Sequence, residues 1–271
     1  MQQPIKFTGV STEYKGVTYN IPLPVFKAVL ANGNNEYTLH LYLDTGSNGS
    51  MLFPYSVRFL YPEFLPGTTD ATTELFIKQL DNNAIGFSKL FRLDHDARLS
   101  EAHENPICCG IIGTDFLKDY ELHINYAISD FYLLQNEEVR LPFTCTYSFE
   151  NNFLFLYAEV EGAKLKLLYD TGMGGPLLLF ERGFAKLTNH NFKAVSREYA
   201  NGAFGAVYYY DAYEQKMPLL FNSHLTFDAE FGVQEKHPFM DIMDCDGILG
   251  NQLFDGKQIL IDYPNQKFSF S

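Results

Sequence analysis

Tryptophan is absent from this 271-residue chain, and cysteine occurs only four times. Four cysteines are too few for a disulfide scaffold, and they show neither the CxxC spacing nor the partnered histidine of a zinc site. We interpret them as small buried apolar side chains, with a redox-sensitive pair as the alternative. The four are Cys108, Cys109, Cys145 and Cys245. Acidic residues and histidines crowd residues 94–104, but their spacing fits no metal site, so we predict a solvated loop there.

Basic residues are also scarce. Lys and Arg total 20 against 33 Asp and Glu, which gives a formal net charge of -13. Phosphate binding needs clusters of Lys and Arg, so this balance argues against a nucleic-acid partner. No stretch approaches the ~20 apolar residues of a membrane-spanning helix. Residues 1–4 lack the basic segment and apolar core of a signal peptide, which leaves a cytoplasmic protein and a mature exported form both open.

Helical periodicity is rare along the chain. Stretches rich in Val, Ile, Phe and Tyr outnumber it, and alternation of apolar and polar residues is common. Both features are typical of strands, so we predict an all-β fold. Short helices are expected at residues 116–119 and 253–255, and another within residues 176–185.

One triplet of residues occurs twice, as Asp44-Thr45-Gly46 and as Asp170-Thr171-Gly172. Each copy follows an apolar run and precedes small residues and a second apolar run. A single copy would be an ordinary turn at the end of a strand. Two copies in matching frames instead indicate a duplicated unit that brings two carboxyl groups together.

The repeat extends on both sides of the triplets. Residues 110–113 and 247–250 match as Gly-hydrophobic-hydrophobic-Gly, and two alternating strands follow each block. A hairpin with a Gly-containing turn precedes each triplet. We therefore predict two lobes joined by a linker. The expected boundaries are 1–137 for the N-terminal lobe, 138–151 for the linker and 152–271 for the C-terminal lobe.

Paired carboxyl groups are an acid/base device. Alone, Asp44 and Asp170 would each have a pKa of about 4, but within hydrogen-bond reach of each other they would share one proton. Such a pair can hold a water molecule, remove its proton as it attacks a peptide carbonyl, and protonate the departing nitrogen. Gly46 and Gly172 lack Cβ and would let backbone N–H groups approach the carboxylates. The alternative is that both aspartates only cap turns.

In these features the chain resembles the aspartic peptidases, the two-lobed pepsin-like enzymes and their shorter retropepsin-like relatives, some of them bacterial. The resemblance rests on the two triplets, on Ser47 after the first, and on the two Gly-ended blocks. It implies an all-β bilobal acid-protease fold, with two pseudo-twofold-related, β-barrel-like lobes and an active-site cleft between them. It also implies endopeptidase activity on polypeptides without metal or other cofactor, and we expect a monomer.

By the same resemblance, five residues would support the two aspartates. Thr45 and Thr171 would hydrogen-bond across the lobe interface, and Ser47 would donate to the first aspartate. Gly113 and Gly250 would pack beneath the two loops.

The chain departs from the pattern at Met173, which occupies the place that matches Ser47. Met cannot donate a hydrogen bond, so we predict weaker stabilisation of ionised Asp170 and place the shared proton on that residue. The same departure keeps a second hypothesis open, a non-catalytic protein that retains the bilobal fold and binds a peptide or protein.

No tyrosine stands where pepsins carry one on a flap hairpin, and we expect one flap per lobe instead. The expected flap and substrate residues are Ile85, Gly86 and Phe87 in the first lobe, and Asn201, Gly202 and Phe204 in the second.

Overall fold

The computed structural model describes residues 5–6, 10–14, 17–21, 24–64, 70–80, 83–94, 108–128, 130–134, 139–173, 175–187, 192–201, 207–213, 215–222, 225–234 and 243–271. Strands dominate these residues, which confirms the all-β prediction. The helices are short: α1 (Pro54–Leu60), α2 (Thr114–Leu117), α3 (Glu181–Phe184) and a 3₁₀ helix at Asn251–Phe254. Among the described residues, none of these helices has the length and apolar character needed to span a membrane.

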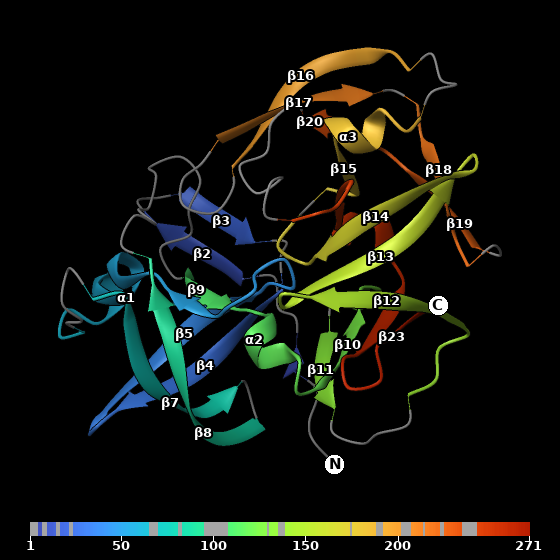
Figure 1. Ribbon diagram of the computed structural model, residues 1–271. Coiled ribbons are helices and arrows are strands. Elements are labelled where there is room, and N and C mark those ends of the chain that lie inside the picture. Colours follow the sequence, from blue (N-terminus) through green and yellow to red (C-terminus); the bar gives the residue numbers. More distant parts are fainter. Residues whose placement is uncertain are drawn as a thin grey trace.

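The first lobe is a closed barrel of strands (Figure 1). Side chains alternate along its long strands, and Tyr37, Leu39, Leu41 and Leu43 all point into the core. This is the period-two pattern that the sequence shows. In barrel order the strands are β4 (Val25–Asn32), β5 (Asn35–Leu43), β9 (Cys108–Ile112), β6 (Met51–Leu52), β8 (Asn83–Leu93) and β7 (Thr72–Leu80).

The second lobe repeats the central strand pairing of the first. Strand β14 runs parallel to β21, which is antiparallel to β15, just as β5 runs parallel to β9 and β9 antiparallel to β6. The strands of this lobe are β13 (Phe153–Val160), β14 (Ala163–Asp170), β15 (Leu177–Phe180), β16 (Ala194–Asn201), β17 (Val207–Tyr213), β18 (Met217–Phe221), β19 (Leu225–Ala229), β20 (Gly232–Gln234) and β21 (Gly247–Gly250).

The strand register shows that the repeat in the sequence is a structural repeat. Leu41 lies opposite Gly110, and Leu167 lies opposite Gly247. Each leucine stands three residues before the aspartate of its triplet, and each glycine opens its Gly-ended block. The alignment made from the sequence therefore holds residue by residue at the centre of both lobes.

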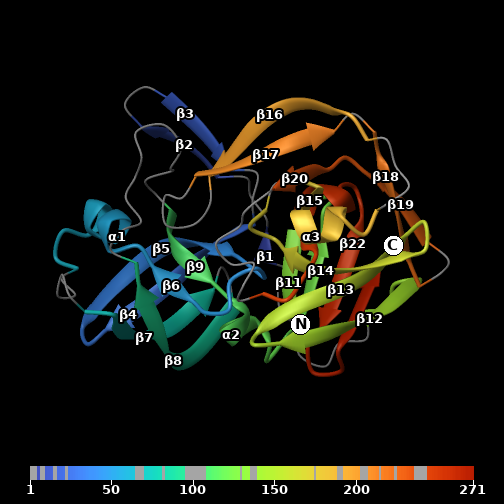
Figure 2. The same ribbon diagram turned by 45° about the horizontal axis from the view of Figure 1, so that its top comes forward.

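Strands from both lobes form one sheet between them (Figures 1 and 2). In it β10 pairs with β22, with Leu122 opposite Ile261 and Ile124 opposite Ile259. The strand order is β1 (Ile5–Lys6), β11 (Asp130–Leu134), β10 (Glu121–Asn125), β22 (Gln258–Asp262), β23 (Lys267–Phe270) and β12 (Phe143–Glu150). Strands β2 (Val10–Tyr14) and β3 (Val17–Ile21) pair with each other as a hairpin.

The segment 138–151, expected as a linker, contains strand β12, which joins β23 to β13. Cys145 and Tyr147 alternate with exposed residues along this strand and are buried. Because these side chains are buried, β12 is an integral part of the sheet, and most of the segment is not a linker.

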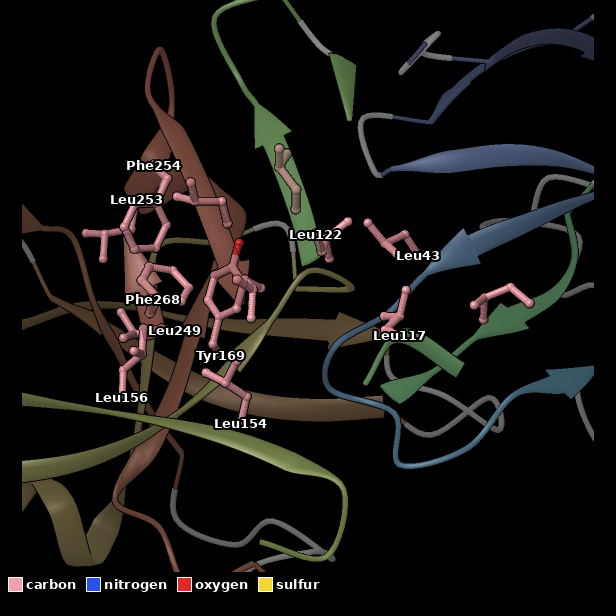
Figure 3. Close-up of a cluster of buried hydrophobic side chains, with 14 of the residues drawn as sticks. Leu43, Leu117, Leu122, Leu154, Leu156, Tyr169, Leu249, Leu253, Phe254 and Phe268 are labelled. Atoms are coloured by element: carbon pink, nitrogen blue, oxygen red, sulfur yellow. The ribbon is translucent and has the colours of Figure 1, made fainter. Parts of the chain in front are cut away.

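The hydrophobic core continues from one lobe into the other. Figure 3 shows Leu43 and Leu117 of the first lobe, Leu122 of the interlobe sheet, and Tyr169 among the apolar residues of the second lobe. Leu43 and Tyr169 directly precede the two aspartates, so the strand ends that carry the triplets are anchored in this core.

Candidate active site

The two Asp-Thr-Gly triplets lie at the ends of equivalent strands and meet between the lobes. Asp44 follows the last residue of β5, and its backbone N–H donates to Ile112 O over 3.0 Å. Asp170 is the last residue of β14 and lies opposite Gly250. Each aspartate is therefore fixed beside the end of a central strand of its own lobe.

The threonines of the triplets bind across the interface in a crossed, symmetric pattern, as predicted. Thr45 Oγ1 donates to Tyr169 O over 2.9 Å, and Thr171 Oγ1 donates to Leu43 O over 2.7 Å. Each hydroxyl also accepts the backbone N–H of the other threonine over 3.0 Å. Both threonines are completely buried. Four hydrogen bonds shielded from water thus set the separation of the two loops.

The glycines of the triplets make close approach possible. Gly46 N–H donates to Asp44 Oδ1 over 2.8 Å, and Gly172 N–H donates to Asp170 Oδ1 over 2.7 Å. A Cβ added at Gly46 would lie 2.3 Å from Asp170 Cγ, and one at Gly172 would lie 3.1 Å from Asp44 Cγ. Each glycine therefore packs against the carboxyl group of the opposite lobe.

The carboxyl groups of Asp44 and Asp170 are close enough to interact directly with each other. Burial raises the pKa of both, and the charge of Asp170 raises the pKa of Asp44 further, well above its ordinary value. Two carboxylates in contact cannot both ionise at low cost, so one proton is shared. Both residues nevertheless keep partial solvent exposure.

The contacts of the two aspartates favour a different position for the shared proton from the one that the sequence predicts. Ser47 Oγ donates to Gly49 O over 2.8 Å, so this hydroxyl is not available to Asp44, and the Ser47 N–H donates to the Asp44 backbone oxygen over 3.3 Å. Gly172 N–H donates to Asp170 Oδ1 over 2.7 Å, and Met173 N–H donates to the Asp170 backbone oxygen over 3.2 Å. Burial raises the pKa of both aspartates, but their mutual contact raises the pKa of Asp44 and lowers that of Asp170, which favours the proton on Asp44. The missing hydroxyl at Met173 has no effect because its counterpart does not reach the dyad.

Gly113 and Gly250 pack beneath the two loops, as predicted. A Cβ at Gly113 would lie 2.8 Å from Ser47 O, and one at Gly250 would lie 2.6 Å from Met173 O. The residue after each glycine donates its backbone N–H to that loop oxygen: Thr114 to Ser47 O over 2.9 Å, and Asn251 to Met173 O over 3.0 Å. Absence of a side chain at the glycines lets the loops rest on the strand ends.

Sequence reasoning missed two groups of residues around the loops. Tyr126 OH bonds to Tyr169 OH over 2.8 Å and donates to Asn251 Oδ1, while Asn251 Nδ2 donates to Thr171 O. The only signal in the sequence was the repeat itself, which matches Tyr126 with Tyr263. In the first lobe, Asp115 Oδ1 accepts both the N–H and the hydroxyl of Ser50, and Asp115 pairs with Lys89 over 2.6 Å.

The first-lobe flap candidates Ile85, Gly86 and Phe87 lie within β8, in the wall of the closed barrel. Ile85 and Phe87 pack against the hydrophobic core, and the Phe87 ring stacks on Phe116 at 5.7 Å between centroids. Side chains committed to the barrel in this way do not form a flap, so the structure does not support that expectation.

Of the second-lobe candidates, Asn201 ends β16, while Gly202 and Phe204 lie outside the described residues. Strands β16 and β17 form a long antiparallel hairpin, with Tyr199 opposite Tyr209. This hairpin stays the predicted flap.

The four cysteines are buried and free, which favours their role as small apolar side chains. Burial raises the pKa of Cys145 to about 12 and that of Cys245 to about 11, so these thiols are protonated at neutral pH. Of the acidic stretch 94–104, all but the first residue lie outside the described part of the chain. Within the described part, no group of three or more His, Cys, Asp or Glu could hold a metal ion.

No protein-family model matches this chain, and no curated protein matches it. Among solved structures, conglutin gamma, a basic 7S globulin from lupine seeds, matches 99% of this chain and 93% of its own chain, with a TM-score of 0.53 and 10% identity. A retropepsin-like aspartic protease from Rickettsia conorii matches 41% of this chain and 75% of its own, with a TM-score of 0.28 and 16% identity. The first likeness shows a shared fold only, and the second is too weak to carry an argument. Together with the topology, the first confirms the two-lobed acid-protease-like fold.

Proposed function

We propose that this protein is an aspartic endopeptidase that hydrolyses internal peptide bonds of extended polypeptides. One observation carries the proposal. The carboxyl groups of Asp44 and Asp170, one from each lobe, interact directly where two matching loops meet, and both keep partial access to solvent. Two adjacent acids of this kind are expensive to bury, and a purely structural role would not need them.

In the proposed reaction, a water molecule binds between the two carboxyl groups. Ionised Asp170 removes a proton from the water as its oxygen attacks the peptide carbon, while protonated Asp44 donates a hydrogen bond and then its proton to the carbonyl oxygen. The tetrahedral intermediate collapses as the C–N bond breaks and the nitrogen receives a proton from the dyad. No covalent bond forms between enzyme and substrate.

Strand β16 has an edge to which an extended polypeptide could bind. Strand β16 stands at one end of the large sheet and, among the described strands, pairs with β17 alone. A peptide in extended form can add to such an edge through backbone hydrogen bonds, and its side chains then fill alternate pockets. We propose this hairpin as the element that covers the substrate.

The test is cleavage of a reduced, unfolded protein between pH 3 and 7, with and without a pepstatin-type inhibitor. Wild-type protein should produce fragments, and Asp44→Asn and Asp170→Asn should each abolish them. Asp228→Asn is the matched control. Asp228 is an exposed aspartate on β19, so this variant should retain full activity. Cleavage that persists in either dyad variant would rule out the assignment.

The second hypothesis, a non-catalytic binding protein, would show itself in the same samples. Peptide binding by the wild-type protein, measured by fluorescence anisotropy, with no fragments at any pH would favour it. Its support in the sequence was Met173, and this support weakens because the matching Ser47 hydroxyl binds Gly49 O and not the dyad.

A further inference from the structure

The peptide unit between Thr171 and Gly172 is held at both ends. Its N–H donates to Asp170 Oδ1 over 2.7 Å, and its carbonyl oxygen accepts from Asn251 Nδ2. Asn251 is only 8% exposed, and its Oδ1 accepts from Tyr126 OH. A continuous chain of hydrogen bonds therefore runs from Tyr126, on the first-lobe side, to the carboxyl group of Asp170.

The matching chain in the first lobe is different. Gly46 N–H donates to Asp44 Oδ1 over 2.8 Å, but Thr114, which matches Asn251, donates its hydroxyl to Ser47 O and Asn152 O. Tyr263 matches Tyr126, and among the described residues its buried hydroxyl has no hydrogen-bond partner. The two lobes thus match in the hydrogen bonds from glycine to aspartate, but they differ in the bonds that the side chains of Thr114 and Asn251 make.

This asymmetry has an electrostatic consequence. A carbonyl that accepts a hydrogen bond polarises its peptide unit and makes the N–H at the other end a stronger donor, and the effect is large where water is excluded. A stronger N–H donor favours the ionised form of the carboxyl group that accepts it. The support behind Asp170 therefore stabilises its negative charge, whereas none of the described residues gives Asp44 an equivalent support.

We propose that Asn251, held in place by Tyr126, is a positioning residue that makes Asp170 the ionised member of the dyad and leaves the proton on Asp44. The catalytic consequence rests on the proposed peptidase function, but the effect on ionisation does not. Asn251 acts through the Thr171–Gly172 peptide and does not touch the reacting atoms.

Among the described residues, the buried titratable groups next to the dyad and its supporting network are phenols. Burial raises the pKa of Tyr126, Tyr169 and Tyr263, and the charge of Asp170 adds to the increase at Tyr169, as the charge of Asp44 does at Tyr263. All three stay neutral across the range in which carboxyl groups titrate. Changes in the dyad over that range therefore report on the two aspartates alone.

The experiment compares the same chemical change at two matching positions. Tyr126→Phe removes the hydroxyl that holds Asn251, and Tyr263→Phe removes a hydroxyl with no partner. For both variants and the wild type, kcat and KM for an unfolded protein substrate are measured against pH. In parallel, the carboxyl carbons of ¹³C-aspartate-labelled protein are titrated by NMR, with the dyad signals assigned from the Asp44→Asn and Asp170→Asn variants.

In Tyr126→Phe we expect the acid limb of the kcat profile, which reports the first ionisation of the dyad, to move up by about half a pH unit, because Asp170 loses part of its stabilisation. The alkaline limb should stay in place, since Asp170 is ionised on both sides of it. We expect kcat to fall by about threefold to tenfold with KM unchanged, and Tyr263→Phe to change neither quantity. Asn251→Thr, which copies the first lobe, should move the acid limb further in the same direction.

Equal shifts in the two phenylalanine variants, or an acid limb that does not move in Tyr126→Phe, would overturn the proposal. The NMR titration distinguishes failure of the positioning role of Asn251 from failure of the proposed peptidase function. If the wild type cleaves nothing, the first ionisation of the dyad must still move up in Tyr126→Phe, and if it does not, the positioning role is wrong by itself.

Discussion

Replacement of Thr171 by valine tests whether the crossed threonines hold the lobes together. Valine has the same shape but no hydroxyl, so the change removes the 2.7 Å bond to Leu43 O and the 3.0 Å bond from Thr45 N–H. Both partners are backbone groups in a region where Thr45 and Thr171 are fully buried. Each buried group left without its partner costs about 1–3 kcal/mol, so we expect the free energy of unfolding to fall by about 3–4 kcal/mol.

The assay is equilibrium unfolding in urea followed by far-ultraviolet circular dichroism. Thr146→Val serves as the control, because Thr146 is an exposed strand residue on β12 and its replacement should change the unfolding free energy by less than about 0.5 kcal/mol. The double variant Thr45→Val with Thr171→Val should cost less than the sum of the single changes, since both hydroxyls belong to one network. A Thr171→Val variant as stable as the control would refute the reasoning.

Three further predictions concern single residues. Because burial and the charge of Asp170 raise the pKa of Asp44, the folded protein keeps a proton that the unfolded chain releases at a pH of about 4. The free energy of unfolding should then fall as pH rises from there through the raised pKa, and Asp44→Asn should remove most of this fall in urea titrations at several pH values. Asp246 is fully buried and pairs with Arg182 over 3.2 Å, so Asp246→Ala should lower the free energy of unfolding by about 3 kcal/mol. Asp244 pairs with the same arginine, but its side chain is 85% exposed, so Asp244→Ala should leave the thermal unfolding temperature unchanged. Gly46→Ala places a Cβ 2.3 Å from Asp170 Cγ and should lower kcat on the order of 100-fold while the variant stays folded; an active variant would contradict the close packing of the loops.

The sequence predicted the parts of this fold that depend on local patterns. Two identical triplets in matching apolar frames, each followed later in its half by a Gly-ended block, were enough to place equivalent strands in two lobes. The glycines were informative because each marks a point where a side chain cannot fit. The resemblance to aspartic peptidases predicts Gly113 and Gly250 beneath the loops, and they lie there.

The features that the sequence did not reveal depend on partners far along the chain. The sequence predicts a linker where β12 lies, because the alternation of Cys145 and Tyr147 identifies a strand only when β23 and β13 are known to lie beside it. The direction of the Ser47 hydroxyl depends on the turn to Gly49, which residue type alone does not determine. The bond between Tyr126 and Asn251 joins residues 125 positions apart, and no local pattern marks it.

The division of the dyad between the halves has a consequence for how the molecule is made. The bonds that join the triplets link residues 124 to 128 positions apart, so the two acids meet only after long-range docking, which is slow compared with local folding. During synthesis, a first half that emerges and folds alone presents a solitary carboxyl group with an unperturbed neighbourhood. The acid pair forms only when the two lobes dock, so the peptidase activity that we propose would first appear at that step of folding.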